Sequence, residues 1–295
     1  MGRVRGVGAG GGTAGRTWRV WADSGAYLLR LRGTRSSGPR RLAYDHGLRT
    51  HLVAAGLPTV EAVATRSGQR WVRHLGRIYE LYPLIDGFQY DGAQPAQRAS
   101  AGGTLARFHL AAASYVAPCG DERIGQYSAL GYGDLVSDRL DDPALQAVVL
   151  RALWPLAEGA EGRALVERCL QRVHRLMETY AGAAYARLTG WVVHGDYTPA
   201  NLLFGPRGAV VGLFDFDWAM PGTRCRDVVD GLYFFGRDED QPDPADIWAL
   251  TATAQWERSR VVAFLRAYQA VAPLAEGELD AIPETFAARW LSIRL

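Results

Sequence analysis

The feature that most restricts the fold of this chain is a change of hydrophobic periodicity near Gly87. Before that glycine, β-prone runs rich in branched and aromatic residues are separated by short turns, a pattern that predicts β-hairpins. The runs of the two predicted hairpins are 17–22 with 26–32, and 71–75 with 78–84. Between the hairpins, Asp45, Leu48 and Leu52 fall at helical spacing, and the pattern ends at Gly56. We therefore expect an antiparallel sheet with one helix in the first part of the chain.

Beyond Gly87, apolar residues recur at helical spacing over longer stretches. The stretches expected to be helical are 96–113, 143–154, 161–185, 225–236, 245–272 and 278–294. Two short apolar runs, 191–193 and 209–214, interrupt them and bracket a polar segment. A length of 295 residues suffices for two domains at roughly 150 residues each. The expected class is α+β, with a sheet-rich N-terminal lobe over 1–84 and a mainly helical C-terminal lobe over 85–295.

The composition excludes several kinds of chemistry. All 33 basic residues are arginine, so a Schiff-base lysine, a lysine base and the lysine of a phosphate-binding P-loop are ruled out. A balance of 33 basic against 31 acidic residues gives no sign of a nucleic-acid-binding surface. No stretch approaches the ~20 apolar residues that span a bilayer, and the three cysteines lack C-x-x-C spacing. We expect a cytoplasmic protein with no nucleic-acid or membrane partner.

The polar segment between the two apolar runs carries the candidate chemistry. It reads WVVHGDYTPANLLFGPRGAVVGLFDFDW over 191–218, and its Asn201 is the only asparagine in the chain. Phosphoryl transfer needs a group that takes the acceptor's proton and a metal that neutralises the phosphates, and Mg²⁺ prefers hard oxygen ligands. The order H-x-D-x-x-x-x-N, followed by a strand ending in D-F-x, supplies these groups as a kinase catalytic loop does.

These motifs resemble those of the aminoglycoside phosphotransferase, choline kinase and type II homoserine kinase superfamily, which shares the bilobal protein-kinase-like fold. HGDYTPANLLF resembles its catalytic loop, and VGLFDFDWAMPGTRCRDVVDG resembles its metal-binding segment. The similarity extends over most of the chain. YLLRLR resembles the third strand of the small lobe, LAYDHGLRTHLVAAGLP its helix, and RIYELYPLIDG the connection where the family's adenine site lies.

The resemblance implies a role for each residue that matches the family's motifs. In the catalytic loop, Asp196 is the implied base and His194 the residue that positions the loop. Asn201 and Asp215 are the implied Mg²⁺ ligands, and Asp217 is expected to add a metal or substrate contact.

Arg30 stands where the family commonly has a lysine that contacts the nucleotide phosphates, and Arg32 follows two residues on, on the same face of the strand. Arginine stays protonated and binds phosphate bidentately, so we expect the phosphate-binding role to survive. The family's glutamate partner of that lysine would be Asp45, which predicts an ion pair between Arg30 and Asp45. Asp227 matches the family's aspartate that braces the catalytic loop.

The nucleotide is expected between the two lobes. Two overlapping G-x-G-x-x-G patterns, GVGAGG and GGGTAG, precede the first hairpin, and this position favours a phosphate-covering loop over a flexible tail. The expected contacts are Gly10 and Gly12 of this loop, with Tyr82 and Leu84 of the connection that the resemblance assigns to the adenine site. The implied cofactors are ATP, with GTP as the alternative nucleotide, and Mg²⁺.

An acidic run follows the metal-binding segment, where the family builds its acceptor pocket. A solvated helix start is the simpler interpretation of such a run, but it would also attract a cationic substrate. The candidate substrate contacts are Asp238, Glu239 and Asp240. We therefore expect a small acceptor that carries a hydroxyl and an amine, such as an aminoglycoside or a similar natural product.

Three alternatives stay open. The tail FLRAYQAVAPLAEGELDAIP is similar to the end of type II homoserine kinases, which favours a homoserine- or choline-type metabolite kinase. A non-catalytic pseudokinase would keep the same residues. A protein kinase is disfavoured, because Thr198 replaces the usual lysine and no segment ending in A-P-E follows Asp215.

Overall fold

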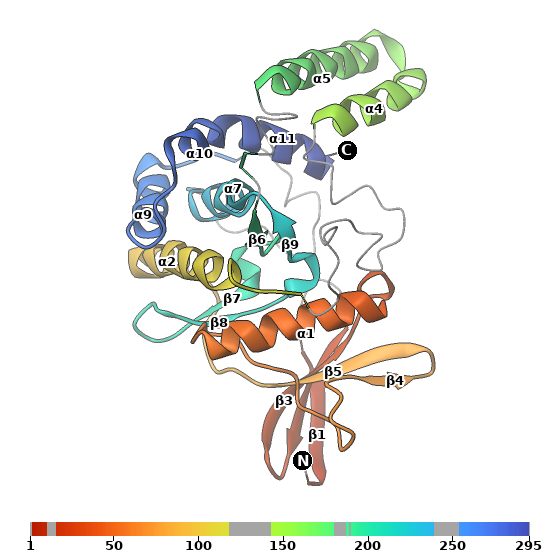
Figure 1. Cartoon of the computed structure of the whole chain (residues 1–295), viewed down its shortest axis with the longest axis vertical. Helices are drawn as coiled ribbons and strands as arrows, with labels where there is room; N and C mark the ends of the chain where they lie inside the picture. The colour runs from red at the N-terminus through yellow and green to blue at the C-terminus, as the bar shows by residue number, and fades with distance from the viewer. Residues whose placement is uncertain are drawn as a thin grey trace.

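The computed structural model describes residues 2–10, 16–117, 143–179, 187–188, 190–238 and 254–294. Within them, an antiparallel five-stranded sheet precedes a mainly helical part (Figure 1). The strands are β1 (Val4–Ala9), β2 (Thr17–Ala22), β3 (Gly25–Leu31), β4 (Val72–His74) and β5 (Arg77–Pro83). Their order is β1-β2-β3-β5-β4. The predicted α+β class is confirmed.

Both predicted hairpins form. β2 pairs with β3, with Ala22 opposite Gly25, and β4 pairs with β5, with His74 opposite Arg77. Gly25 has a φ of 137° in its turn, a conformation that glycine adopts without a steric cost. β3 then pairs with β5 in a register that places Arg30 opposite Glu80. The sheet thus brings a basic and an acidic side chain together across neighbouring strands.

The beginning of the chain departs from the prediction of a loop. Residues 4–9 form β1 and pair with β2, with Gly8 opposite Arg19. The ring of Trp21 lies against this strand, and a Cβ on Gly8 would come within 3.2 Å of it. Gly8 therefore makes room for an aromatic ring within a sheet. Of the connection between β1 and β2, residues 11–15 lie outside the described residues, and Gly12 is among them.

Helix α1 (Pro39–Ala54) lies between the sheet and the helical part (Figure 1). It starts with a proline in its first turn, where no backbone N–H is needed, and Gly56 follows it at a φ of 78°. Leu48 and Leu52 are fully buried at the predicted spacing. They share one core with side chains of the helical part. The lobe boundary between residues 84 and 85 stays a prediction.

The helical part contains seven described helices and four short strands. The helices are α2 (Pro95–Ala112), α4 (Pro143–Leu153), α5 (Gly159–Thr179), α7 (Arg224–Phe235), α9 (Arg258–Gln269), α10 (Glu276–Asp280) and α11 (Ile282–Arg294). The strands form two antiparallel pairs, β6 (Trp191–Val193) with β9 (Met220–Gly222) and β7 (Leu202–Phe204) with β8 (Val210–Leu213). α4 and α5 lie at the end of the molecule farthest from the sheet (Figure 1). Among the residues described, no helix has the length and apolar character needed to cross a membrane.

Two predicted helices have different bounds in the structure. In the described part of 245–272, α9 begins at Arg258, and Trp256 before it forms a single β-bridge with Arg237. Trp256 also donates its indole N–H to Tyr233 O at 3.3 Å, so tertiary contacts override the helical pattern there. The predicted helix 278–294 is divided into α10 and α11. Pro283 cannot donate the backbone bond that would continue α10, which explains the division.

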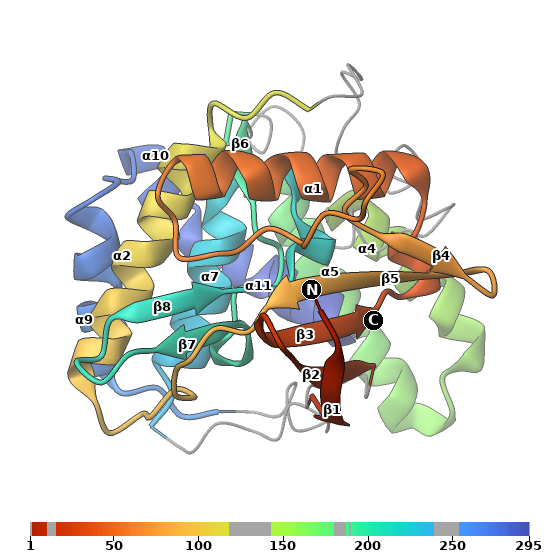
Figure 2. The same ribbon diagram turned by 90° about the horizontal axis from the view of Figure 1, so that it is seen from below.

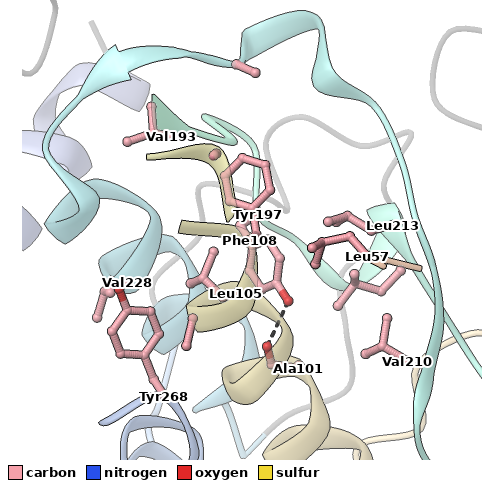
Figure 3. Close-up of a cluster of buried hydrophobic side chains, with 14 of the residues drawn as sticks. Leu57, Ala101, Leu105, Phe108, Val193, Tyr197, Val210, Leu213, Val228 and Tyr268 are labelled. Atoms are coloured by element: carbon pink, nitrogen blue, oxygen red, sulfur yellow. Dashed lines mark hydrogen bonds between the residues drawn. The ribbon is translucent and has the colours of Figure 1, made fainter. Parts of the chain in front are cut away.

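The core holds the polar segment in place. Leu105 and Phe108 of α2 pack with Val193 of β6 and Val228 of α7 (Figure 3). Buried Tyr197 donates its hydroxyl to Ala101 O of α2 at 2.8 Å, the bond drawn in Figure 3. The loop that follows β6 is thereby fixed to the longest buried helix of the core.

Candidate active site

The loop 194–201, which follows β6, is anchored by the buried carboxylate of Asp227. The backbone N–H of His194 donates to Asp227 Oδ2 at 2.6 Å, and that of Gly195 donates to Oδ1 at 2.8 Å. Gly195 turns the chain at a φ of 80°, and a Cβ there would lie 2.3 Å from Trp218 O. The predicted bracing contact of Asp227 is confirmed by these two bonds.

Asp196 is held by the two residues that the motif predicts around it. His194 Nε2 lies 2.8 Å from Phe214 O and His194 Nδ1 lies 3.3 Å from the Asp196 N–H, which fits a neutral ring with its proton on Nε2. Asn201 Nδ2 donates to both Asp196 O and Asp196 Oδ2 at 2.8 Å. Burial and the nearby carboxylate of Asp215 raise the pKa of Asp196.

Asp215 and Asn201 present oxygen atoms that could hold a cation. Asp215 follows β8 in a left-handed conformation, with φ 60° and ψ 69°, and its side chain is 39% exposed. Both amide hydrogens of Asn201 face Asp196, which leaves its carbonyl oxygen for a ligand. Among the described residues, no group of three or more His, Cys, Asp or Glu could hold a metal ion. Two hard oxygen ligands completed by phosphates fit Mg²⁺.

A cavity of about 510 Å³ lies at this site. Residues on or next to β3, β5, β7 and β8 line it, and Figure 2 shows these strands from below the molecule. Among its lining residues are Gly10, Arg30, Tyr82, Leu84, Asn201 and Asp215, all of them predicted site residues. Gly12 lies outside the described residues. Asp45 does not line this cavity.

The expected ion pair between Arg30 and Asp45 does not form. Asp45 pairs with Arg32 and with Arg41, whose Nε lies 2.7 Å from Asp45 Oδ1. Arg30 instead contacts Asp215 and Asp217. The side chain of Arg32 is 1% exposed against 18% for Arg30, so the more deeply buried arginine meets the buried carboxylate of α1. Residue spacing along β3 cannot distinguish these depths.

The structure describes Asp217 fully, but it describes only Asp238 of the three candidate residues in the acidic run. Asp217 pairs with Arg30 and Arg32 and accepts a bond from Ser36 Oγ. Although burial opposes ionisation, the two arginines lower the pKa of Asp217 to about 2. Asp238 is exposed beyond α7. Glu239 and Asp240 lie outside the described residues, so the substrate contacts of this run stay a prediction.

Sequence reasoning missed Arg49 of α1. This arginine lines the cavity, is 5% exposed, and has its guanidinium 4.8 Å from the Tyr82 ring and 4.7 Å from the Phe216 ring. It donates to Thr59 Oγ1 at 3.3 Å. Its position four residues after Asp45 places it on the same helix face as that residue, and this spacing is the signal that could have found it.

This chain is similar to known proteins over most of its length. A family model described as "Phosphotransferase enzyme family" matches residues 6–274. The homoserine kinase of Methylobacillus flagellatus is 27% identical over 272 residues, which cover 92% of this chain and 72% of that protein.

Solved structures share the fold over nearly the whole chain. An aminoglycoside phosphotransferase from Alicyclobacillus acidocaldarius has a TM-score of 0.64 at 17% identity, covering 99% of this chain and 81% of that one. An amicoumacin kinase, solved with AMP-PNP, Ca²⁺ and its ligand, has a TM-score of 0.66 at 16% identity, covering 97% and 79%. These similarities confirm the predicted kinase-like fold.

Proposed function

The chain belongs to the phosphotransferase enzyme family, and from this we propose that it is an ATP- and Mg²⁺-dependent kinase that phosphorylates a hydroxyl of a small, amine-bearing molecule. The observation that carries the proposal is the cavity in which Asn201 and Asp215 face Arg30 and Tyr82. Asn201, which lines the cavity, also donates to Asp196 Oδ2, although Asp196 itself is not a lining residue. A base, two oxygen ligands and a phosphate-binding cation are the groups that phosphoryl transfer needs.

In the proposed reaction, Asp196 accepts the proton of the acceptor hydroxyl as its oxygen bonds to the γ-phosphorus, and the bond to the ADP oxygen breaks. Asn201 occupies Asp196 Oδ2, which leaves Oδ1 for the acceptor hydroxyl. The raised pKa of Asp196 strengthens its hold on that proton. Asn201 and Asp215 would hold Mg²⁺, which when bound neutralises charge on the phosphates. Arg30 and Gly10 would contact the phosphates, and Tyr82 and Leu84 the base.

The first test replaces Asp196 by Asn. Because this change removes the proton acceptor and keeps the shape, we expect turnover to fall by roughly 10²-fold or more, with ADP affinity nearly unchanged. ADP release measures turnover, and calorimetry measures ADP binding. Asp280→Asn, at an exposed carboxylate of α10, is the matched control. If the Asp196→Asn variant keeps its turnover, Asp196 is not the group that accepts the proton.

The acceptor has two candidate classes. The amine-bearing natural products follow from the acidic run, and the amino-alcohol metabolites gain support from the similarity to a homoserine kinase. ADP release measured against aminoglycosides, nucleoside antibiotics, homoserine and choline separates them, and we expect one class to stimulate release. Nucleotide binding without consumption, with any of these acceptors, would support a pseudokinase instead.

A further inference from the structure

Asp217 is surrounded by donors that come from the sheet and the turn after it. Its Oδ1 lies 3.1 Å from Arg30 Nη1 and its Oδ2 lies 2.7 Å from Arg30 Nη2, so the two groups meet through parallel bonds. Ser36 Oγ donates to Oδ2 at 2.9 Å, and Arg32 Nη2 lies 3.3 Å from Oδ1. The side chains of Asp217 and Arg30 are 15% and 18% exposed. Such bidentate pairs fix orientation as well as distance.

Of the other carboxylates near Arg30, Asp45 and Glu80 are bound mainly by other arginines. Asp45 is engaged by Arg32 and Arg41. Glu80, opposite Arg30 on β5, lies 4.0 Å from Arg30 Nη1 but 2.8 Å from Arg32 Nη1. Asp217 therefore makes the shortest contact to Arg30 among the carboxylates that the structure pairs with it.

The turn that carries Asp217 is itself fixed. This 3₁₀ turn, η5 (Phe216–Trp218), is bound through its backbone by Arg41 of α1. Arg41 Nη1 donates to Ala219 O at 2.6 Å and Nη2 donates to Phe216 O at 2.5 Å. The same turn begins directly after Asp215, whose Oδ1 lies 3.1 Å from Arg30 Nη2. One short turn thus contacts the phosphate-binding cation and presents a predicted metal ligand.

We infer that Asp217 is a positioning residue, which orients the Arg30 guanidinium toward the nucleotide phosphates beside Asp215. The inference rests on the proposed function and replaces the metal or substrate contact expected for Asp217, because both of its oxygens are bound by donors of the chain. Asp217 acts on the nucleotide only through Arg30. Its loss therefore weakens nucleotide binding without changing acceptor binding.

A double-mutant cycle of Asp217→Asn and Arg30→Met tests this. We expect Asp217→Asn to raise the KM for ATP about tenfold, as for loss of a charge-assisted bond, and to leave the acceptor KM unchanged. The double variant should bind ADP as weakly as Arg30→Met alone, because Asp217 acts through Arg30. The matched control is Glu278→Gln, which breaks a buried ion pair with Arg224 outside the cavity and should lower Tm without raising the nucleotide KM selectively.

Additive losses in the cycle, or an equal rise of both KM values, would overturn the inference. If Asp217→Asn fails to fold, Ser36→Ala removes one donor from the same carboxylate and should raise the nucleotide KM by a smaller factor; an unchanged KM would also overturn it. A wild-type protein that binds ADP but phosphorylates no acceptor contradicts the proposed function, while the ADP-binding cycle still decides the role of Asp217. A wild-type protein that binds no ADP overturns both.

Discussion

At the scale of single residues, the candidate site depends on two backbone conformations with positive φ. Gly195 has a φ of 80° in the loop before Asp196, and Asp215, two residues after β8, has a φ of 60°. A side chain in the left-handed region costs on the order of 1–2 kcal/mol, and such strain gathers at functional sites. In Asp215 the conformation turns a carboxylate toward the cavity, whereas Gly195 allows two backbones to approach.

Gly195→Ala tests this close approach. Its Cβ would lie 2.3 Å from Trp218 O, so the loop must shift, and we expect kcat to fall at least tenfold, roughly the cost of a small misplacement of reacting groups. Gly190→Ala is the control, because its φ is 108° but nothing lies within 4 Å of the added Cβ. It should lose some stability and keep kcat. Steady-state kinetics measures kcat and thermal unfolding measures the stability of both variants. Equal kcat values for Gly195→Ala and Gly190→Ala would show that the close approach at Gly195 does not matter for turnover.

At the scale of elements, α2 and α9 cross at two small residues of α2. A Cβ on Gly102 would lie 2.3 Å from Phe264 O of α9, whereas a Cβ on Gly103 would find Arg107 Nη1 at 3.6 Å, an ordinary contact. The two glycines are neighbours in the same helix, yet only one is required by packing. α2 also carries His109 and receives the Tyr197 bond, so its spacing to α9 affects the loop 194–201.

Alanine substitutions at Gly102 and Gly103 are expected to change the free energy of unfolding in opposite directions. Gly102→Ala forces the helices apart, and we expect it to lower the free energy of unfolding by roughly 1–3 kcal/mol, as overpacking does. Gly103→Ala should raise it by up to about 1 kcal/mol, because alanine favours the helix. Chemical denaturation of both variants measures the difference. A destabilising effect of the same size from both substitutions would show that the crossing does not distinguish them.

The elements also show what the sequence could predict. Both hairpins and α1 follow from turn residues and periodicity, which are local. β1 could not be predicted, because its glycines carry no strand signal and become a strand only against β2 and the ring of Trp21. The pair of Arg30 with Asp45 was expected from the family resemblance and is wrong. The sequence shows that Arg30 and Arg32 share one face of the strand, but which of them reaches Asp45 depends on the packed fold.

At the scale of the whole molecule, a buried hydrogen-bonded chain joins three helices beneath the site. His109 of α2 lies 3.0 Å from Asp227 Oδ2 of α7 through Nε2, and 2.8 Å from the hydroxyl of Tyr268 of α9 through Nδ1. Burial lowers the pKa of His109 below its ordinary value of 6.5, against the opposing effect of Asp227. The folded protein therefore favours the neutral ring.

This burial predicts an acid-sensitive stability. Below pH 6.5 the unfolded chain protonates this histidine more readily than the folded protein does, so stability falls as pH falls from 6.5 toward the lower folded pKa. His109→Gln should be less stable at neutral pH but lose less stability over this window. Urea unfolding at several pH values measures the slopes, with exposed His74→Gln as the control. A His109→Gln slope equal to that of the wild type would contradict the prediction.

The arginine at position 30 has a practical consequence for detecting this protein. Reagents that report on nucleotide sites by acylating an amine beside the phosphates need a lysine there, since that amine is the nucleophile. The cavity presents a guanidinium from Arg30 instead, and the chain contains no lysine at all. A chemical survey of a proteome with such reagents would leave this site unlabelled even when the reagent occupies it.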